Sequence, residues 1–229
     1  MNQTGMTKKL KIIAAFLFIH SLTFAQNVRI KIDGPAALKG RKAIILTREK
    51  GFAAVVHSIK LSADSINLQM DPNLLPDLYQ LQVSQMKGSL TFFFESGMRI
   101  LLDTNDISRS IISHSASNTE WQYFHKSILL PSEEKVNHFL KQEVYASKNN
   151  LRDSVTYWHH LQEIEKEDLN LKTLLFIQEH PRSYVSLYLL KTNWYAFRNT
   201  NAFEMLHSSL FHHRTYRYLK EKNKAVTRN

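Results

Sequence analysis

The chain has 229 residues, of which 43% are hydrophobic and 22% charged, and its formal net charge is +10. This length allows one or two domains that fold without a disulfide or a metal, and this composition excludes a wholly disordered chain. The sequence contains no cysteine. Disulfide bonds, CxxC redox chemistry, thiolate nucleophiles and cysteine-ligated zinc or iron–sulfur sites are therefore excluded.

Residues 1–25 have the layout of a secretory signal peptide. Lysines at positions 8, 9 and 11 precede an uncharged, mainly apolar run over 12–25 that ends in small residues. We predict cleavage after Ala25 and a mature protein in the periplasm or cell envelope, with no transmembrane helix. The alternative is an uncleaved anchor, but a spanning helix needs roughly 20 apolar residues, more than this run supplies. We expect an exported basic chain to bind anionic lipid, polysaccharide or an acidic protein partner, and we expect no binding to nucleic acid.

Alternating apolar residues predict strands over 26–112. Alternation places one face of a strand on a core and the other in water. The six glycines, which mark turns, all lie before residue 98. We therefore predict an antiparallel β-sandwich or open barrel of about seven strands. The segments that show alternation or a uniformly apolar run are 28–32, 43–46, 53–61, 66–70, 79–83, 90–94 and 98–102.

Apolar residues three or four apart predict a region of about five to six helices over 113–229, so the fold class is α+β. Ser132, directly after Pro131, is a candidate N-cap, and Ser183 is another. Asn201 and Glu204 resemble a capping box. The longest predicted helix runs over 152–179, and the residues expected to face inward there are Val155, Trp158, Leu161, Ile164, Leu171 and Leu175.

No motif in the sequence points to a reaction. There is no HExxH, G-x-S-x-G, GxxxxGK[ST] or GxGxxG. His159 and Glu163 have the i, i+4 spacing of helical metal ligands, but such pairs are common on solvated helices. We therefore predict a protein that is not an enzyme, with no catalytic residue, no cofactor and no metal site.

Two sets of residues are candidates for contact with a partner. Consecutive aromatic residues cannot all face one core, so a patch of Trp194, Tyr195 and Phe197 is predicted to be exposed. The last twenty residues are strongly basic, and a helix end of this kind is usually solvated or meets an anionic partner. The basic residues proposed for that contact are Arg214, Arg217, Lys220 and Lys222.

Three segments together carry a resemblance to a known family. They are residues 92–103 (FFFESGMRILLD), 113–121 (SHSASNTEW) and 176–190 (FIQEHPRSYVSLYLL). With the preceding signal peptide, they resemble the β-rich domain of unknown function and helical connector that precede the thioredoxin-like domain in envelope thiol-disulfide oxidoreductases of the AhpC/TSA, ResA and TlpA kind. The resemblance covers essentially the whole mature chain. The change from strand to helix pattern along the sequence predicts a β-rich domain at 26–112 and a helical region at 113–229.

The chain departs from this family in its chemistry. The catalytic CxxC motif of the thioredoxin-like domain has no counterpart here, so no catalytic residue is carried over. Three hypotheses remain open. The chain is a non-enzymatic exported accessory or binding module for an envelope protein, such as a thioredoxin-like protein. Alternatively, it is the front part of a split or truncated oxidoreductase that works with a separate thioredoxin-like protein, or a cysteine-independent envelope enzyme.

Overall fold

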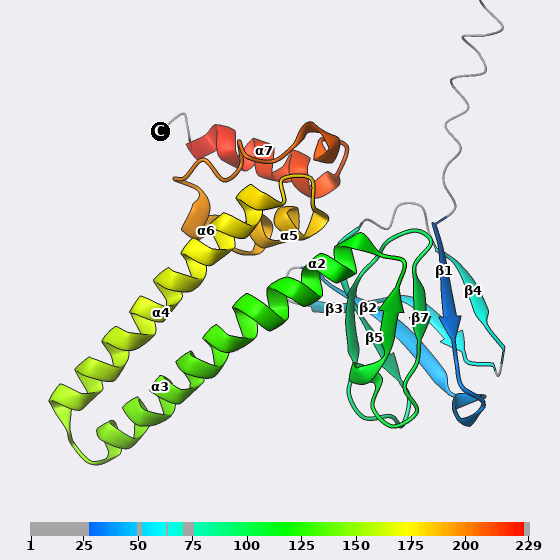
Figure 1. Ribbon diagram of the computed structural model, residues 1–229, viewed down its shortest axis with the longest axis horizontal. Coiled ribbons are helices and arrows are strands. Elements are labelled where there is room, and N and C mark those ends of the chain that lie inside the picture. The colour runs from blue at the N-terminus through cyan, green and yellow to red at the C-terminus, as the bar shows by residue number, and fades with distance from the viewer. Residues whose placement is uncertain (1–27, 50–51, 63, 71–75, 227–229) are drawn as a thin grey trace, which may run out of the picture.

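A computed structural model describes residues 28–49, 52–62, 64–70 and 76–226 (Figure 1). The predicted signal peptide and its cleavage site lie outside these residues. Within them the fold is α+β, as predicted: strands occupy the chain as far as Ser113, and the long helices begin at Ala116.

Eight strands are described, one more than the sequence indicated, and they form two sheets. One sheet has the order β4-β1-β7-β8 and the other has the order β3-β2-β5-β6. The strand missed by the sequence is β8, which is only three residues long and exposes 62% of Ile111. The strands are β1 (Val28–Asp33), β2 (Lys42–Glu49), β3 (Phe52–Lys60), β4 (Ile66–Met70), β5 (Leu78–Val83), β6 (Leu90–Phe93), β7 (Arg99–Leu101) and β8 (Ile111–Ser113).

The expectation of a purely antiparallel arrangement is wrong at one pair, because β1 and β7 run parallel. The turn before β7 contains Gly97, whose φ is +84°, a conformation that glycine adopts without a steric penalty. The N–H of Gly97 donates to the carbonyl of Arg29 over 2.9 Å. The chain therefore starts β7 beside the beginning of β1, and the two strands run in the same direction.

Apolar residues of both sheets form one buried cluster. Ile32 and Ile100 come from one sheet, Leu81 and Phe92 come from the other, and all four are completely buried. The two sheets thus share a core, as the alternation of apolar residues predicted. The finer expectation of a sandwich or open barrel stays a prediction.

The helical region begins with one long, continuous helical segment. α2 (Ala116–Phe124) leads into a π-helical turn (His125–Leu129) and then α3 (Leu130–Lys148). The predicted helix start at Ser132 is wrong, because Ser132 is buried inside α3. The N–H of Leu130 donates to the carbonyl of His125, five residues back. This wider turn lies directly before Pro131, where a proline interrupts regular α-helical bonding.

The remaining helices are α4 (Arg152–Glu179), α5 (Tyr184–Thr192), the short α6 (Trp194–Phe197) and α7 (Arg214–Val226). The predicted cap is confirmed, since the Ser183 side chain accepts from the N–H of Val185. The predicted capping box at Asn201 and Glu204 is wrong: residues 201–206 form turns, and Glu204 accepts from Asn223 of α7 over 2.9 Å.

Phe93 joins the sheets to the helices. At the end of β6, the side chains of Phe92 and of Phe94, which directly follows the strand, face the core of the sheets, whereas Phe93 faces the other way into the core of the helices. Its ring lies 5.8 Å from that of Trp121 and 5.6 Å from that of Tyr188. One fully apolar segment therefore contributes to both cores.

Candidate functional site

The predicted aromatic patch is only partly exposed. Trp194 and Phe197 retain 5% and 2% of their accessible surface, because both pack into the core of the helices. The expectation that they form an exposed patch is wrong. Tyr195 lies between them in sequence and points outward, with 77% of its surface exposed. Consecutive side chains of a helix point about 100° apart, so the neighbours of an exposed residue can be buried.

The basic residues predicted for partner contact lie on α7, and one of them, Lys222, lies close to Tyr195. Arg214, Arg217 and Lys220 are exposed, and Lys222 is partly buried. The ammonium of Lys222 lies 5.5 Å from the ring centre of Tyr195 and 4.9 Å from that of Tyr218. These distances fit cation–π contacts. Tertiary structure therefore brings one residue of each predicted set together, in a positively charged, aromatic surface.

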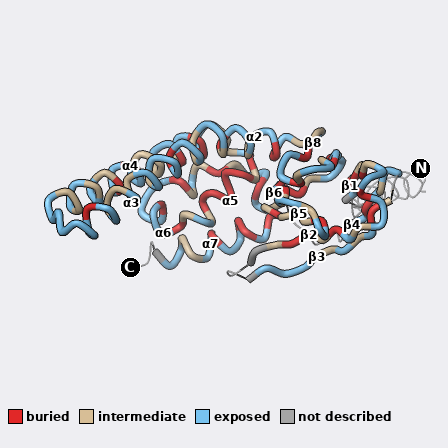
Figure 2. The backbone as a smooth tube through the Cα atoms, turned by 90° about the horizontal axis from the view of Figure 1, so that it is seen from below, coloured by how far each residue is buried: buried red, intermediate tan, exposed pale blue. Residues whose placement is uncertain are grey.

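A second surface lies on the arm formed by α3 and α4, which extends away from the sheets (Figure 1). The 28 residues of α4 span about 42 Å. Figure 2 shows that most of this arm is exposed or intermediate, in contrast to the buried α5. The arm is therefore a two-helix projection whose outer faces meet solvent.

The contact between α3 and α4 is notably polar. Gln162 and Glu165 of α4 are 93% buried or more at this contact. Lys135 of α3 donates to Glu165 over 3.0 Å, and Gln162 donates to Glu143 of α3. Phe139 of α3 also stacks on Trp158 of α4, with ring centres 6.1 Å apart, so the contact combines buried polar pairs with aromatic packing.

Apolar side chains of α4 face outward instead. Ile164, Leu171 and Leu175 expose 47%, 62% and 56% of their surface, so the expectation that they face inward is wrong. They belong to a set whose spacing alternates between four and three residues, as in the seam of a coiled coil. We call this set the outer seam of α4, and it consists of Tyr157, Leu161, Ile164, Asp168, Leu171 and Leu175.

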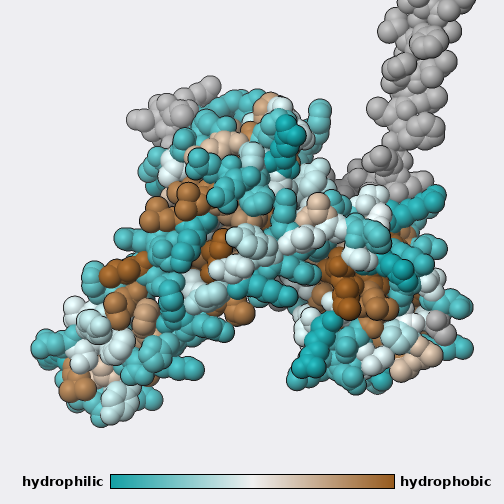
Figure 3. Space-filling view, viewed as in Figure 1, coloured by the Kyte–Doolittle hydropathy of each residue, from teal (hydrophilic) through white to brown (hydrophobic). Residues whose placement is uncertain are grey.

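The outer seam is continuous except for one polar residue. Asp168 forms an ion pair with Lys172, one turn further along α4. Figure 3 shows separate apolar patches along the arm formed by α3 and α4. Monomeric soluble proteins rarely expose a regular apolar stripe of this length. The spacing was visible in the sequence, but the polar residues of the inner contact carried no signal that they would be buried.

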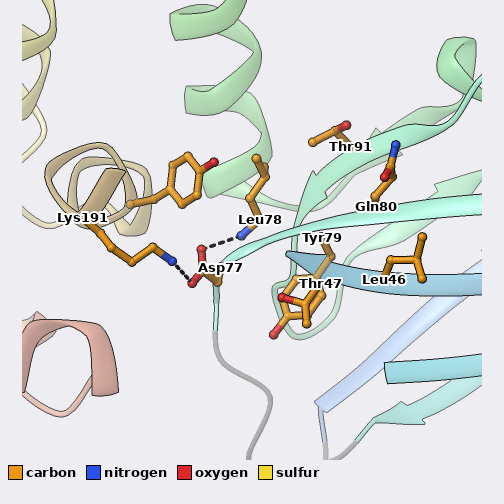
Figure 4. Close-up of a pocket in the computed structure, with 9 residues that line it drawn as sticks. Leu46, Thr47, Asp77, Leu78, Tyr79, Gln80, Thr91 and Lys191 are labelled. Atoms are coloured by element: carbon orange, nitrogen blue, oxygen red, sulfur yellow. Dashed lines mark hydrogen bonds and ion pairs between the residues drawn. The ribbon is translucent and has the colours of Figure 1, made fainter. Parts of the chain in front are cut away.

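A cavity of about 300 Å³ lies where α5 meets β2, β5 and β6 (Figure 4). Asp77 and Lys191 form an ion pair at one end of it. The other oxygen of Asp77 accepts from the N–H of Leu78 over 2.8 Å. Both carboxylate oxygens are thus engaged, which fits a role in holding α5 to the sheet.

His213 lies near this ion pair and is 94% buried. Burial lowers the pKa of His213, and the nearby Asp77 carboxylate only partly offsets this effect, while Lys191 and Arg214 add to it. The Nδ1 atom accepts from the N–H of Thr215 over 3.1 Å, at the start of α7. The neutral ring is therefore the form that the folded state favours.

We expect the protein to lose thermal stability as the pH falls below 6.5, the ordinary pKa of histidine. Below that pH the unfolded chain binds a proton that the folded state resists, so protonation favours unfolding. His213→Asn keeps an acceptor for the Thr215 N–H and cannot be protonated. Melting temperatures measured at pH 7.5 and 5.5 should differ less in this variant than in the parent. An unchanged difference would contradict the assignment to His213, and His160→Asn, at an exposed position, is the control.

His159 and Glu163, which have metal-ligand spacing, pair with different residues. His159 is exposed and its Nδ1 lies 3.6 Å from Glu143, while Glu163 pairs with Lys166 over 2.6 Å. Among the described residues, no group of three or more His, Asp or Glu side chains is placed to hold a metal ion.

No helix among the described residues is long and apolar enough to cross a membrane. Comparison with protein families, curated proteins and solved structures finds no match to the chain.

Proposed function

We propose that this chain is a non-enzymatic binding module of the cell envelope, and that it binds a helix of a partner protein on the outer seam of α4. The observation that carries the proposal is the inverted distribution of residues on α4. The helix buries Gln162 and Glu165 against α3 and exposes Ile164, Leu171 and Leu175. A second helix packed on the outer seam would remove these apolar side chains from water.

The spacing and charge of α4 indicate what kind of helix would bind. Intervals of four and three residues match a partner helix with the same apolar spacing. Acidic residues outnumber basic ones in α4. By helical periodicity, Asp153, Glu167 and Glu179 lie beside the seam. Lys172 also lies beside it, but its charge is paired with Asp168. The partner helix is therefore amphipathic and basic. A thioredoxin-like protein, which the family resemblance implies as partner, stays a prediction.

The test is site-specific photo-cross-linking of the full chain in an envelope extract of the source organism. A photoreactive p-benzoylphenylalanine replaces Leu161 of the outer seam. We expect one cross-linked product, with the cross-link in a basic amphipathic helix of the partner. Ile164→Glu introduces a charge into the seam and should lower the yield more than tenfold, the equivalent of about 1.4 kcal/mol.

The matched control is Leu140→Glu, which places the same charge at an exposed apolar residue of α3 outside the seam. Its cross-linking yield should remain close to that of the parent. Equal loss in both variants, or no cross-linked product, would contradict the proposal. A product that contains only two copies of this chain would also contradict the proposal, because it would show that the outer seam binds a second copy of the chain instead of a partner helix.

A further inference from the structure

The outer edge of β6 has backbone groups that face away from its sheet. β6 is the last strand of its sheet among the described strands. The N–H of Phe94 donates to the carbonyl of Asp77, just before β5. The backbone N–H and C=O groups of Phe94 therefore face β5. Backbone groups alternate in direction along an antiparallel strand, so those of Phe93, Thr91 and Ser89 face outward.

Both ends of this edge are closed by the protein itself. At one end, Asn118 of α2 accepts from the N–H of Phe93 over 2.8 Å and donates to its carbonyl over 2.7 Å. At the other end, the N–H of Ile107 donates to the carbonyl of Lys87 over 2.9 Å. The open edge at Ser89 to Thr91 is about 10 Å long, the length of three extended residues.

The open edge borders a cavity of about 550 Å³ between β6, β8 and α2. Its apolar lining includes Trp121 and Ile111, and Ile111 is 62% exposed. Its charged lining is cationic: Arg109 and Lys126 contribute to it, and none of the described lining residues is Asp or Glu.

The two cations are available to a ligand. Neither Arg109 nor Lys126 forms an ion pair with a carboxylate of the described residues, although Arg109 is near enough to Asp103 and Asp106 to attract both carboxylates electrostatically. The nearest acidic loop already satisfies its own carboxylates. Asp106 accepts from the N–H and hydroxyl of Ser108, and Asp103 accepts from the N–H groups of Asn105 and Asp106.

We propose that this cavity binds the C-terminal end of an extended peptide, which adds a short strand to β6. The backbone of the peptide pairs with the outward groups of Thr91, and its terminal carboxylate binds Arg109 and Lys126. Addition of an extended peptide to an open sheet edge and capture of a terminal carboxylate are two recurring modes of peptide recognition, and this cavity offers the groups for both. A chain end fits the cavity better than a through-running segment, because Asn118 and the Lys87–Ile107 bond close the edge. This site is separate from the outer seam of α4.

The test uses a pool of hexapeptides with randomised last four positions, offered to the immobilised full chain as free carboxylates and as C-terminal amides. We expect the free-carboxylate pool to be retained about tenfold better. The double variant Arg109→Gln/Lys126→Gln should remove this preference. Lys39→Gln/Lys60→Gln removes the same charge at exposed positions outside the cavity and should leave the preference unchanged.

Pairing with the backbone is tested independently. Thr91→Pro removes the outward N–H and leaves the bonds from β6 to β5 intact, so it should weaken retention of the free-carboxylate pool. In the unsubstituted chain, exchange of the Thr91 amide hydrogen should slow when the pool is added. Equal retention of carboxylates and amides would overturn the proposal. So would a preference that survives in the double variant, or Thr91 exchange that the peptides leave unchanged.

Discussion

Replacing Phe93 with alanine is expected to lower the free energy of unfolding by about 3–5 kcal/mol, the cost of removing a large buried aromatic side chain. Phe93 is completely buried and contacts Trp121 of α2 and Tyr188 of α5. The cavity left behind would lie where the sheets meet the helices. Chemical denaturation followed by circular dichroism measures the loss.

The control for this variant is Phe211→Ala, because Phe211 is 45% exposed. We expect its loss to stay below about 1 kcal/mol. The substitution at Phe93 is also expected to separate two unfolding transitions, since it weakens the contact between two cores that each retain their own apolar cluster. A loss no larger than that of the control would show that Phe93 does not hold the two parts together.

Replacing Asn118 with leucine is expected to lower the free energy of unfolding by about 3 kcal/mol. Asn118 is 98% buried and pairs with both backbone groups of Phe93, as a neighbouring strand would. Leucine has a similar size but cannot form these bonds, so a buried N–H and a buried carbonyl lose their partner. Asn137→Leu makes the same exchange at an exposed position of α3, where the change should stay within about 0.5 kcal/mol.

Hydrogen exchange gives a second measurement of the Asn118 contact. The amide hydrogen of Phe93 is expected to exchange faster in Asn118→Leu than in the parent, because its acceptor is gone. Thr91 lacks this bond in both proteins and should change less. Unaltered exchange at Phe93, together with unaltered stability, would contradict the role given to Asn118.

The elements with strong local patterns were predictable. Alternation or a uniformly apolar run identified β1 to β7, and the caps and spacing identified α4, α5 and α7. The features that were missed or misplaced depend on contacts with residues far away in the chain, and these contacts override the local sequence pattern. Pro131 predicted a helix start, but a π-helical turn carries the helix through it. β8 is short and pairs with β7 through contacts that its own residues do not reveal.

The candidate surfaces were less predictable than the fold. The basic residues of α7 were found from composition, and the structure places Lys222 of that set against Tyr195. The cationic cavity beside β6 was not found, because Arg109 and Lys126 lie on different elements and share no motif. Convergence of distant residues depends on how the elements pack, which one sequence does not encode in any short pattern.

The sequence by itself determined the absence of thiol chemistry, the order of strands before helices and the basic character of α7. Only the tertiary structure decided which side of each element is buried. In α4, the periodicity correctly indicated an apolar stripe, but packing against α3 buries the neighbouring polar positions and leaves Ile164 and Leu171 exposed. The physical reason is that periodicity reports the local backbone geometry, whereas burial depends on the surface that another segment presents.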